Sequence, residues 1–216
     1  MRNDNYALWV LLAFCATGFC IVSALVKNHG IDGFDSLVTT WVQSTQSAGL
    51  FHFSHQLAAV GAPKLLMKAA VSLALLGAVI HCFVRQQRYK ALAQQLILFG
   101  AINIAAYYSN VWLKIWFHRT RPLAYIPSYS YPSGHAMLAF AFYITAAYLI
   151  WQNIPSRAGR MAVTIGCSLL TLFIGLSRVY LSWHYPSDIV GGYFVSGGIL
   201  AAALLFERHW HRPQQS

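Results

Sequence analysis

Three short polar clusters interrupt a mostly apolar sequence, and together they contain cations, histidines and a carboxylate. They are Lys114 with Arg119, Arg121 and Pro122; Pro132-Ser133-Gly134-His135; and Ser177-Arg178 followed by His184 and Asp188. Ionisable groups within or beside long apolar stretches are costly and are usually functional. These clusters are therefore the first candidates for a site that does chemistry.

The cations in the clusters predict an anionic ligand. Lys114, Arg121 and Arg178 would repel one another unless an anion lay among them, because only one acid accompanies them. Arginine binds phosphate through two parallel hydrogen bonds, and lysine adds a point charge. Ser133 and Gly134 begin an apolar stretch, and backbone N–H groups at the start of a helix also bind phosphate. We therefore predict a phosphate-binding site.

Two histidines supply what phosphoryl transfer still requires, a nucleophile and a proton donor. Asp188 follows His184 by four residues and is close enough to hold the imidazole ring and fix its tautomer. This pairing favours His184 as the nucleophile. It leaves His135 as the general acid that protonates the leaving oxygen.

The pattern predicts chemistry without a metal or another cofactor. The fixed cations neutralise the charge that Mg²⁺ would otherwise stabilise during phosphoryl transfer, and a carboxylate cluster for magnesium is missing from the sequence. His52 and His55 form an H-x-x-H pair with no further ligand nearby in the sequence, so we favour headgroup contact or solvation for them.

The composition indicates that a membrane must hold these clusters. Hydrophobic residues make up 57% of the 216 residues and charged residues only 9%, whereas a soluble domain has roughly a quarter charged residues. This excludes a cytosolic enzyme, a disordered chain and a small secreted disulfide scaffold. With 15 Lys and Arg against 5 Asp and Glu, most bases should face lipid phosphates or an anionic substrate.

We predict an all-α integral membrane protein, a bundle of six transmembrane helices in one domain over residues 1–216. About 20 apolar residues are needed to cross a bilayer, and the six stretches that qualify are 7–26, 63–84, 91–117, 133–151, 161–181 and 189–206. In this topology the end of span three, the start of four, the end of five and the start of six lie on one membrane face. The three polar clusters therefore converge there.

The last span is predicted to lie inside the bundle. Gly192 with Ser196, and Gly198 with Ala202, repeat small residues at a spacing of four. Small residues at this spacing allow helix backbones to approach closely in a membrane.

The distribution of bases predicts the orientation. Apart from three cations assigned to the site, one side has four bases, Lys27, Lys64, Lys68 and Arg119. The other side has eight, which are Arg2, Arg85, Arg88, Lys90, Arg157, Arg160, Arg208 and Arg212. Positive residues favour the cytoplasmic side. We therefore expect a multi-pass protein of the cell membrane with cytoplasmic termini and the site at the extracytoplasmic face.

The connection between spans one and two, Lys27 to Ala62, has its own pattern. An apolar stripe at helical spacing consists of Phe34, Leu37, Val38, Trp41 and Val42, and polar residues fill the opposite face. We expect an amphipathic helix in the interface plane, with Asp32 as a possible cap. A structural bracket and a lipid-guiding segment are equally compatible with this pattern.

The spacing of the clusters resembles a known family. Lys114-x6-Arg121-Pro122, Pro132-Ser133-Gly134-His135 and Ser177-Arg178-x5-His184-x3-Asp188 are similar to the three-part signature of the type 2 phosphatidic acid phosphatases, in order, spacing and topological position. Arg119 and His118 lie outside this signature, and we favour a solvated loop over headgroup contact for both.

The resemblance implies metal-independent removal of phosphate from a lipid phosphate or diphosphate through a phosphohistidine intermediate. By match, His184 would be the nucleophile, Asp188 its partner and His135 the acid. The residues that would hold the phosphate are Lys114, Arg121, Ser133, Gly134 and Arg178. The short chain resembles bacterial members that act on undecaprenyl diphosphate or phosphatidylglycerophosphate.

Two other functions are compatible with some of these residues. A phosphotransferase on the same scaffold would pass the phosphoryl group to a lipid or sugar instead of water. An anion transporter would use the basic cluster as its binding site, but broken helices or paired repeats near the midplane, which are typical of transporters, are not apparent in the sequence. No pattern indicates nucleic-acid binding.

Overall fold

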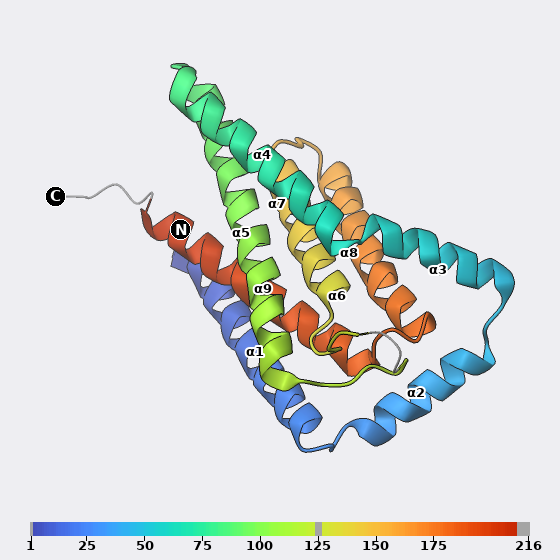
Figure 1. The fold of residues 1–216 in the computed structure, drawn as a ribbon. Coiled ribbons are helices and arrows are strands. Elements are labelled where there is room, and N and C mark those ends of the chain that lie inside the picture. Colours follow the sequence, from blue (N-terminus) through green and yellow to red (C-terminus); the bar gives the residue numbers. More distant parts are fainter. Residues whose placement is uncertain (1, 124–126, 211–216) are drawn as a thin grey trace.

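The computed structural model describes residues 2–123 and 127–210, and these residues are helical except at short connections (Figure 1). The elements are α1 (Arg2–Lys27), α2 (Asp32–Ser44), α3 (Ala48–Val60), α4 (Pro63–Phe83), α5 (Gln87–Phe117), α6 (Gly134–Ala139), η1 (Phe140–Ile144), α7 (Thr145–Trp151), α8 (Arg157–Tyr180) and α9 (Pro186–Trp210). The described residues contain no strand. The prediction of an all-α protein is confirmed.

Within the described residues, six stretches of helix are long and apolar enough to cross a membrane, as predicted. They are Asn5–Lys27, Ala48–Phe83, Gln87–Phe117, Gly134–Trp151, Arg157–Tyr180 and Pro186–His209. The second stretch includes both α3 and α4, which meet at Gly61 and Ala62 before Pro63 opens α4. The fourth consists of α6, the π-helical turn η1 and α7 in direct succession.

Helices α5 and α8 are among those that begin earlier than the hydropathy pattern predicts. Helix α5 starts at Gln87 and α8 at Arg157, each four residues before the expected boundary. Ser156 caps α8 by accepting a hydrogen bond from the backbone N–H of Gly159. A polar first turn is stable where such a cap and water satisfy its N–H groups, and hydropathy does not detect it.

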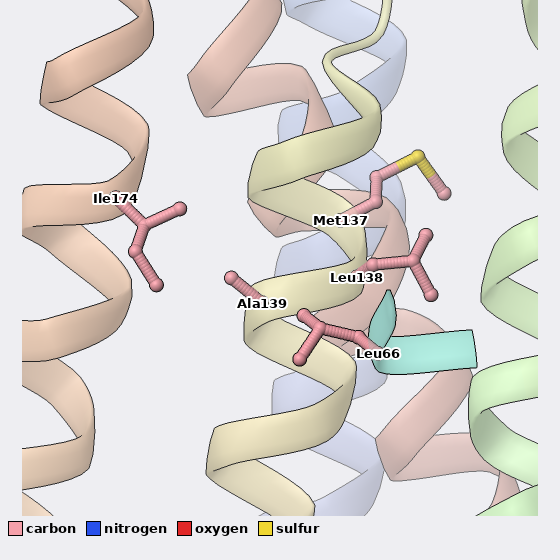
Figure 2. Close-up of a cluster of buried hydrophobic side chains, with 5 residues drawn as sticks. All are labelled: Leu66, Met137, Leu138, Ala139 and Ile174. Carbon is pink, nitrogen blue, oxygen red and sulfur yellow. The ribbon is translucent and has the colours of Figure 1, made fainter. Parts of the chain in front are cut away.

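The buried core lies around α6. Met137, Leu138 and Ala139 of α6 are fully buried between Leu66 of α4 and Ile174 of α8 (Figure 2). Apolar contacts on several sides fix the position of this short helix. The core therefore sets the depth of the residues at the start of α6, where one of the polar clusters lies.

Helix α9 packs closely against α1 and α6, which confirms its predicted place inside the bundle. The Ser196 hydroxyl donates to the Met137 carbonyl over 2.9 Å. A Cβ at Gly197 would lie 2.8 Å from the Cys15 sulfur. Small residues therefore allow both neighbours to approach the α9 backbone.

Helices α1 and α9 also bring the two described ends of the chain together. Asn5, Trp9, Phe206 and His209 line one common pocket. This end of the bundle is opposite the loops that follow α5 and α8 (Figure 1). We call the end with those loops the site end.

Helix α2 crosses the site end, and two of its polar residues point inward. Asp35 and Thr39 are buried, whereas Phe34, Leu37 and Trp41 are exposed. Val38 and Val42, from the same predicted stripe, pack against a buried cluster that includes Val179 and Ile189. An apolar outer surface is favourable where lipid is the solvent, which leaves the polar side of α2 free to face the protein.

The expected cap of α2 is not present. Ile31 occupies the N-cap position without a side-chain hydrogen bond, and Asp32 is the first helical residue. The Asp32 carboxylate contacts His29 and Arg119 instead. A carboxylate in the first turn still interacts favourably with the helix dipole.

Packing of α4 on α5 depends on a glycine, which gives a test of the fold. A Cβ at Gly77 would lie 2.8 Å from the Ala93 carbonyl oxygen and 2.8 Å from the Leu96 Cβ. We expect Gly77→Ala to lower the free energy of unfolding by about 1–3 kcal/mol, because the two helices must separate. Thermal unfolding of the detergent-solubilised protein measures this effect.

Gly166 in α8 provides the matched control, because a Cβ there meets nothing within 4 Å. Gly166→Ala should leave the unfolding temperature unchanged or slightly raised. Equal losses in both variants would contradict the packing described for α4 and α5.

Candidate active site

The three polar clusters meet at the site end of the bundle. The backbone N–H of Ser133 donates to the Asp188 carbonyl over 3.0 Å, which joins the starts of α6 and α9. The loop between α5 and α6 folds back on itself, with the Ser130 N–H donating to the Arg119 carbonyl over 2.8 Å. His184 lies between α8 and α9 and contacts both Arg121 and Asp188. Residues far apart in the sequence thus form one site.

His184 and Asp188 form a buried pair. The distance between His184 Nδ1 and Asp188 Oδ2 is 3.2 Å, and the histidine is 1% exposed. The same carboxylate oxygen accepts a hydrogen bond from the Tyr185 N–H over 2.9 Å. An ionised Asp188 can only accept, so it favours the tautomer with the proton on Nδ1. The Nε2 atom then carries a lone pair and no proton.

The other ring nitrogen of His184 faces a cation. His184 Nε2 lies 3.2 Å from a terminal nitrogen of Arg121, which also donates to the Trp183 carbonyl over 2.8 Å. Burial lowers the pKa of His184 well below its ordinary value, and the charges of Arg121, Lys114 and Arg178 lower it further. The imidazole is therefore neutral at physiological pH, the state in which its nitrogen is nucleophilic.

Lys114 and Arg121 are held in place mainly by carbonyl oxygens. The Lys114 ammonium donates to the Tyr129 carbonyl over 2.7 Å. Arg121 Nε donates to both the carbonyl and the hydroxyl of Ser128, each over 3.0 Å. Neutral acceptors orient these cations without cancelling their charge, so the charge remains available to an anion.

Arg178 is the least satisfied cation of the site. Its side chain is 1% exposed and its guanidinium lies 4.1 Å from the centre of the Trp183 ring. Within the described residues, Arg178 Nε and one terminal nitrogen have no hydrogen-bond partner. Buried charged donors without an acceptor are costly. Their presence beside other cations indicates an anion-binding position.

The start of α6 brings the second cluster to the same place. Ser133 caps the helix by accepting a hydrogen bond from the Ala136 N–H. A Cβ at Gly134 would lie 2.9 Å from the Asn110 side-chain oxygen, so a larger residue would displace the cap. His135 follows, half-buried, with the cations Arg178, Lys114 and Arg121 and the His184 ring as its neighbours. All eight candidate site residues therefore belong to one constellation.

Arg119 is not in a solvated loop, and that prediction was wrong. Its side chain is only 11% exposed, and its guanidinium donates to Asp188 over 2.8 Å, to Asp35 over 2.7 Å and to the Ser187 hydroxyl over 2.7 Å. Burial opposes its charge, but Asp188 and Asp35 together raise the pKa of Arg119. His118, its neighbour, is exposed as predicted.

One signal in the sequence points to Arg119. A carboxylate buried with a neutral histidine needs a cation as partner, and Arg119 precedes Arg121 by two residues. Residues two apart in an extended segment share a face, so the spacing alone does not give these two arginines different partners. Arg119 reaches the carboxylate side of the His184–Asp188 pair, and Arg121 reaches the Nε2 side.

The unsatisfied state of Arg178 leads to a test. We expect Arg178→Met to abolish activity and yet raise the free energy of unfolding by about 1–3 kcal/mol, because it removes unpaired buried donors. Arg160→Met is the matched control. Arg160 also stacks on a tryptophan, Trp151 at 4.5 Å, but its Nε donates to the Ile154 carbonyl over 2.7 Å. Thermal unfolding should show no gain for Arg160→Met, and a loss of stability in Arg178→Met would make Arg178 a structural residue.

The lowered pKa of His184 leads to a second test. A histidine with an ordinary pKa of about 6.5 loses its neutral form as the pH falls through that value. The lowered pKa keeps His184 neutral further into acid, so kcat/KM should be retained below pH 6.5 once ionisation of the substrate phosphate, measured by ³¹P NMR, is subtracted. A remaining acid limb at pH 6.5 or above would contradict the electrostatics described for the site.

Comparison with known proteins identifies the family. The family model described as the PAP2 superfamily matches residues 95–212. Phosphatidylglycerophosphatase B of Bacillus subtilis (strain 168) is 27% identical over 181 residues, covering 81% of this chain and 84% of that protein. A provisionally named undecaprenyl-diphosphatase of Escherichia coli (strain K12) is 32% identical over 87 residues, covering 40% and 39%.

The fold has a counterpart in a solved structure. The crystal structure of a transmembrane PAP2-type phosphatidylglycerolphosphate phosphatase from Bacillus subtilis superposes with a TM-score of 0.72, covering 95% of this chain and 98% of that one at 23% identity. The match in fold extends over the six spans, and the match of the family model includes all three polar clusters. The chain is a multi-pass membrane phosphatase that belongs to the PAP2 superfamily.

Proposed function

We propose that the protein hydrolyses a membrane lipid phosphate or diphosphate through a phosphohistidine formed on His184. The observation that carries this proposal is the position of His184 Nε2, which lies among cations and 3.2 Å from Arg121. One of these cations, Arg178, has two buried nitrogens with no acceptor among the described residues. A phosphoryl group bound there would satisfy those donors and lie against the nucleophile. Binding and positioning of this kind supply much of the catalysis in phosphoryl transfer.

The proposed reaction has two steps. The His184 Nε2 lone pair attacks phosphorus in line, the bond from phosphorus to the lipid oxygen breaks, and His135 gives its proton to that oxygen. Water then attacks the phosphohistidine, its proton passes to the neutral His135, and the bond from phosphorus to nitrogen breaks. Phosphate is released and both histidines return to their starting forms.

Fixed cations take the role of a metal in this proposal. Lys114, Arg121 and Arg178 surround the phosphoryl position in this proposal, and Gly134 adds an N–H group at the start of the helix that Ser133 caps. Asp188 holds the His184 ring and stabilises the positive charge that develops on it during attack.

Phosphatidylglycerophosphate is the first candidate substrate and undecaprenyl diphosphate the second. The relative named phosphatidylglycerophosphatase B matches over most of both chains, whereas the relative named an undecaprenyl-diphosphatase matches over less than half of each. The longer match supports the first candidate. In both cases the phosphate group is what the site cations bind.

The extracytoplasmic face is the proposed location of the site. Arg119 pairs with buried carboxylates and so no longer counts as a loop base. The side of the bundle with the site then has three loop bases against eight on the other side. This distribution supports cytoplasmic termini.

The central test is phosphate release by purified protein in detergent from both candidate lipids, with EDTA throughout. We expect wild-type turnover in EDTA and a loss of at least a thousandfold in His184→Ala, because no nucleophile remains. His52→Ala, which removes an exposed histidine of α3, is the matched control and should keep wild-type activity. Normal turnover by His184→Ala, or restoration by Mg²⁺ after loss in EDTA, would contradict the proposal.

The intermediate is tested by rapid acid-free quenching with a ³²P-labelled substrate. We expect label on the protein that is stable to alkali and lost in acid, as a phosphoramidate bond requires, and absent from His184→Ala. A labelled lipid or sugar product in place of free phosphate would instead indicate phosphotransfer. Anion flux into liposomes that survives His184→Ala would indicate a transporter.

A further inference from the structure

Arg119 gathers most of the acidic residues of this protein. The sequence contains five carboxylates in all, and three of them contact the Arg119 guanidinium. These are Asp188 at 2.8 Å, Asp35 at 2.7 Å and Asp32 at 3.5 Å. In a chain with a net charge of +10, this concentration of acids at one cation requires a specific reason.

Asp35 joins helix α2 to the start of α9. Its side chain is 1% exposed, and besides Arg119 it accepts two hydrogen bonds from Ser187, from the backbone N–H over 3.1 Å and from the hydroxyl over 2.5 Å. The first N–H groups of a helix have no partner within the helix. A carboxylate from α2 therefore caps α9 one residue before Asp188.

Arg119 in turn fixes the orientation of the Asp188 carboxylate. One oxygen, Oδ2, accepts from Tyr185 and lies next to His184. The other, Oδ1, accepts from Arg119 over 2.8 Å and lies 3.5 Å from the Ser130 hydroxyl. Without Arg119, Oδ1 would keep only the long contact, and a fully buried charge would lose its main partner.

We propose that Arg119 and Asp35 are positioning residues of the active site, which hold Asp188 in the orientation that serves His184. Helix α2 then contributes to the active site through the contact between its Asp35 and Arg119. This inference rests on the proposed role of His184 as nucleophile and Asp188 as its partner. Mutation of a residue that orients a functional side chain without touching the substrate typically lowers activity by about 10–100-fold.

Other contacts hold α2 in place, so the role of Asp35 can be tested separately. Gln43 donates to the Ser182 hydroxyl over 3.2 Å, and Gln46 donates to the Tyr180 carbonyl over 3.0 Å. The backbone N–H of Ser47 donates to the Tyr180 hydroxyl over 2.9 Å. Removing the charge of Asp35 should therefore leave α2 against α8.

The experiment measures kcat and KM for Arg119→Gln, Asp35→Asn and the double variant. The probes are short-chain phosphatidylglycerophosphate and short-chain phosphatidic acid in mixed micelles. We expect kcat to fall about 100-fold in Arg119→Gln and about 10-fold in Asp35→Asn, with KM within threefold of wild type. The double variant should match Arg119→Gln, because both changes break one connected network.

Two further variants separate positioning from a general loss of structure. Arg119→Lys keeps the charge but cannot bond Asp188 and Asp35 together, so kcat should lie between that of wild type and that of Arg119→Gln. Asp32→Asn is the matched control, since Asp32 is on the same helix, is 49% exposed and lies 3.5 Å from Arg119, while its shorter contact, 2.8 Å, is with the exposed His29. Its kcat should stay within twofold of wild type.

Several outcomes would overturn the inference. One is a wild-type kcat in Arg119→Gln. Another is a rise in KM with kcat unchanged, which would place Arg119 on the headgroup. A third is full additivity, in the double variant, of the losses in kcat measured for the two single variants. An equal loss in Asp32→Asn would also overturn it. His184→Ala, measured in the same series, distinguishes failure of the proposed function from failure of the positioning role. If His184→Ala remains active, the proposed function fails. If it is inactive while Arg119→Gln has normal activity, only the positioning role fails.

Discussion

A carboxylate buried at the start of a helix is the constraint on which the site depends. Asp188 has no exposed surface, so its charge must be compensated by protein groups alone. The Tyr185 N–H, the His184 ring and the Arg119 guanidinium supply that compensation from three directions. To bring them together, α9 must begin beside α8, and the loop after α5 must return across both. The local fold of the site end follows from this requirement.

The arginines at the site end include two kinds, which differ in their hydrogen-bond partners. Arg119 donates to carboxylates on two different helices, through both of its terminal nitrogens. Arg178, which is more deeply buried, stacks on Trp183 and has two nitrogens without an acceptor among the described residues. The first kind of cation holds helices together, and the second kind has donors that an anion could satisfy. The number of acceptors around a buried arginine therefore separates scaffold from site more clearly than burial does.

Sequence patterns predict the spans and the convergence of the clusters because both follow from simple physics. Apolar length defines a span, and the parity of the spans decides which helix ends share a face. The contact between Arg119 and Asp35 could not be predicted in this way. It joins residues 84 positions apart, one in a loop and one on α2, and no local periodicity relates them. Only the three-dimensional packing brings them within hydrogen-bonding distance.

The face of α2 that meets the protein could not be predicted either, for a different reason. An amphipathic pattern shows that a helix has two unlike faces, but it does not show which face meets the protein. Phe34 and Trp41 face outward while Asp35 faces inward. In water the reverse arrangement would be favoured. The surrounding solvent, rather than the sequence of the helix, decides between the two.

The concentration of acids at Arg119 has a consequence for the lipids around the protein. Of fifteen bases and five acids, one base and three acids meet there, which leaves fourteen bases and two acids for the rest of the chain. So unbalanced a charge draws anionic lipids into the annulus around the bundle, over about a Debye length. A lipid that loses a phosphate group becomes less negative. The same field that enriches such a substrate near the protein then releases its product, and salt weakens both effects together.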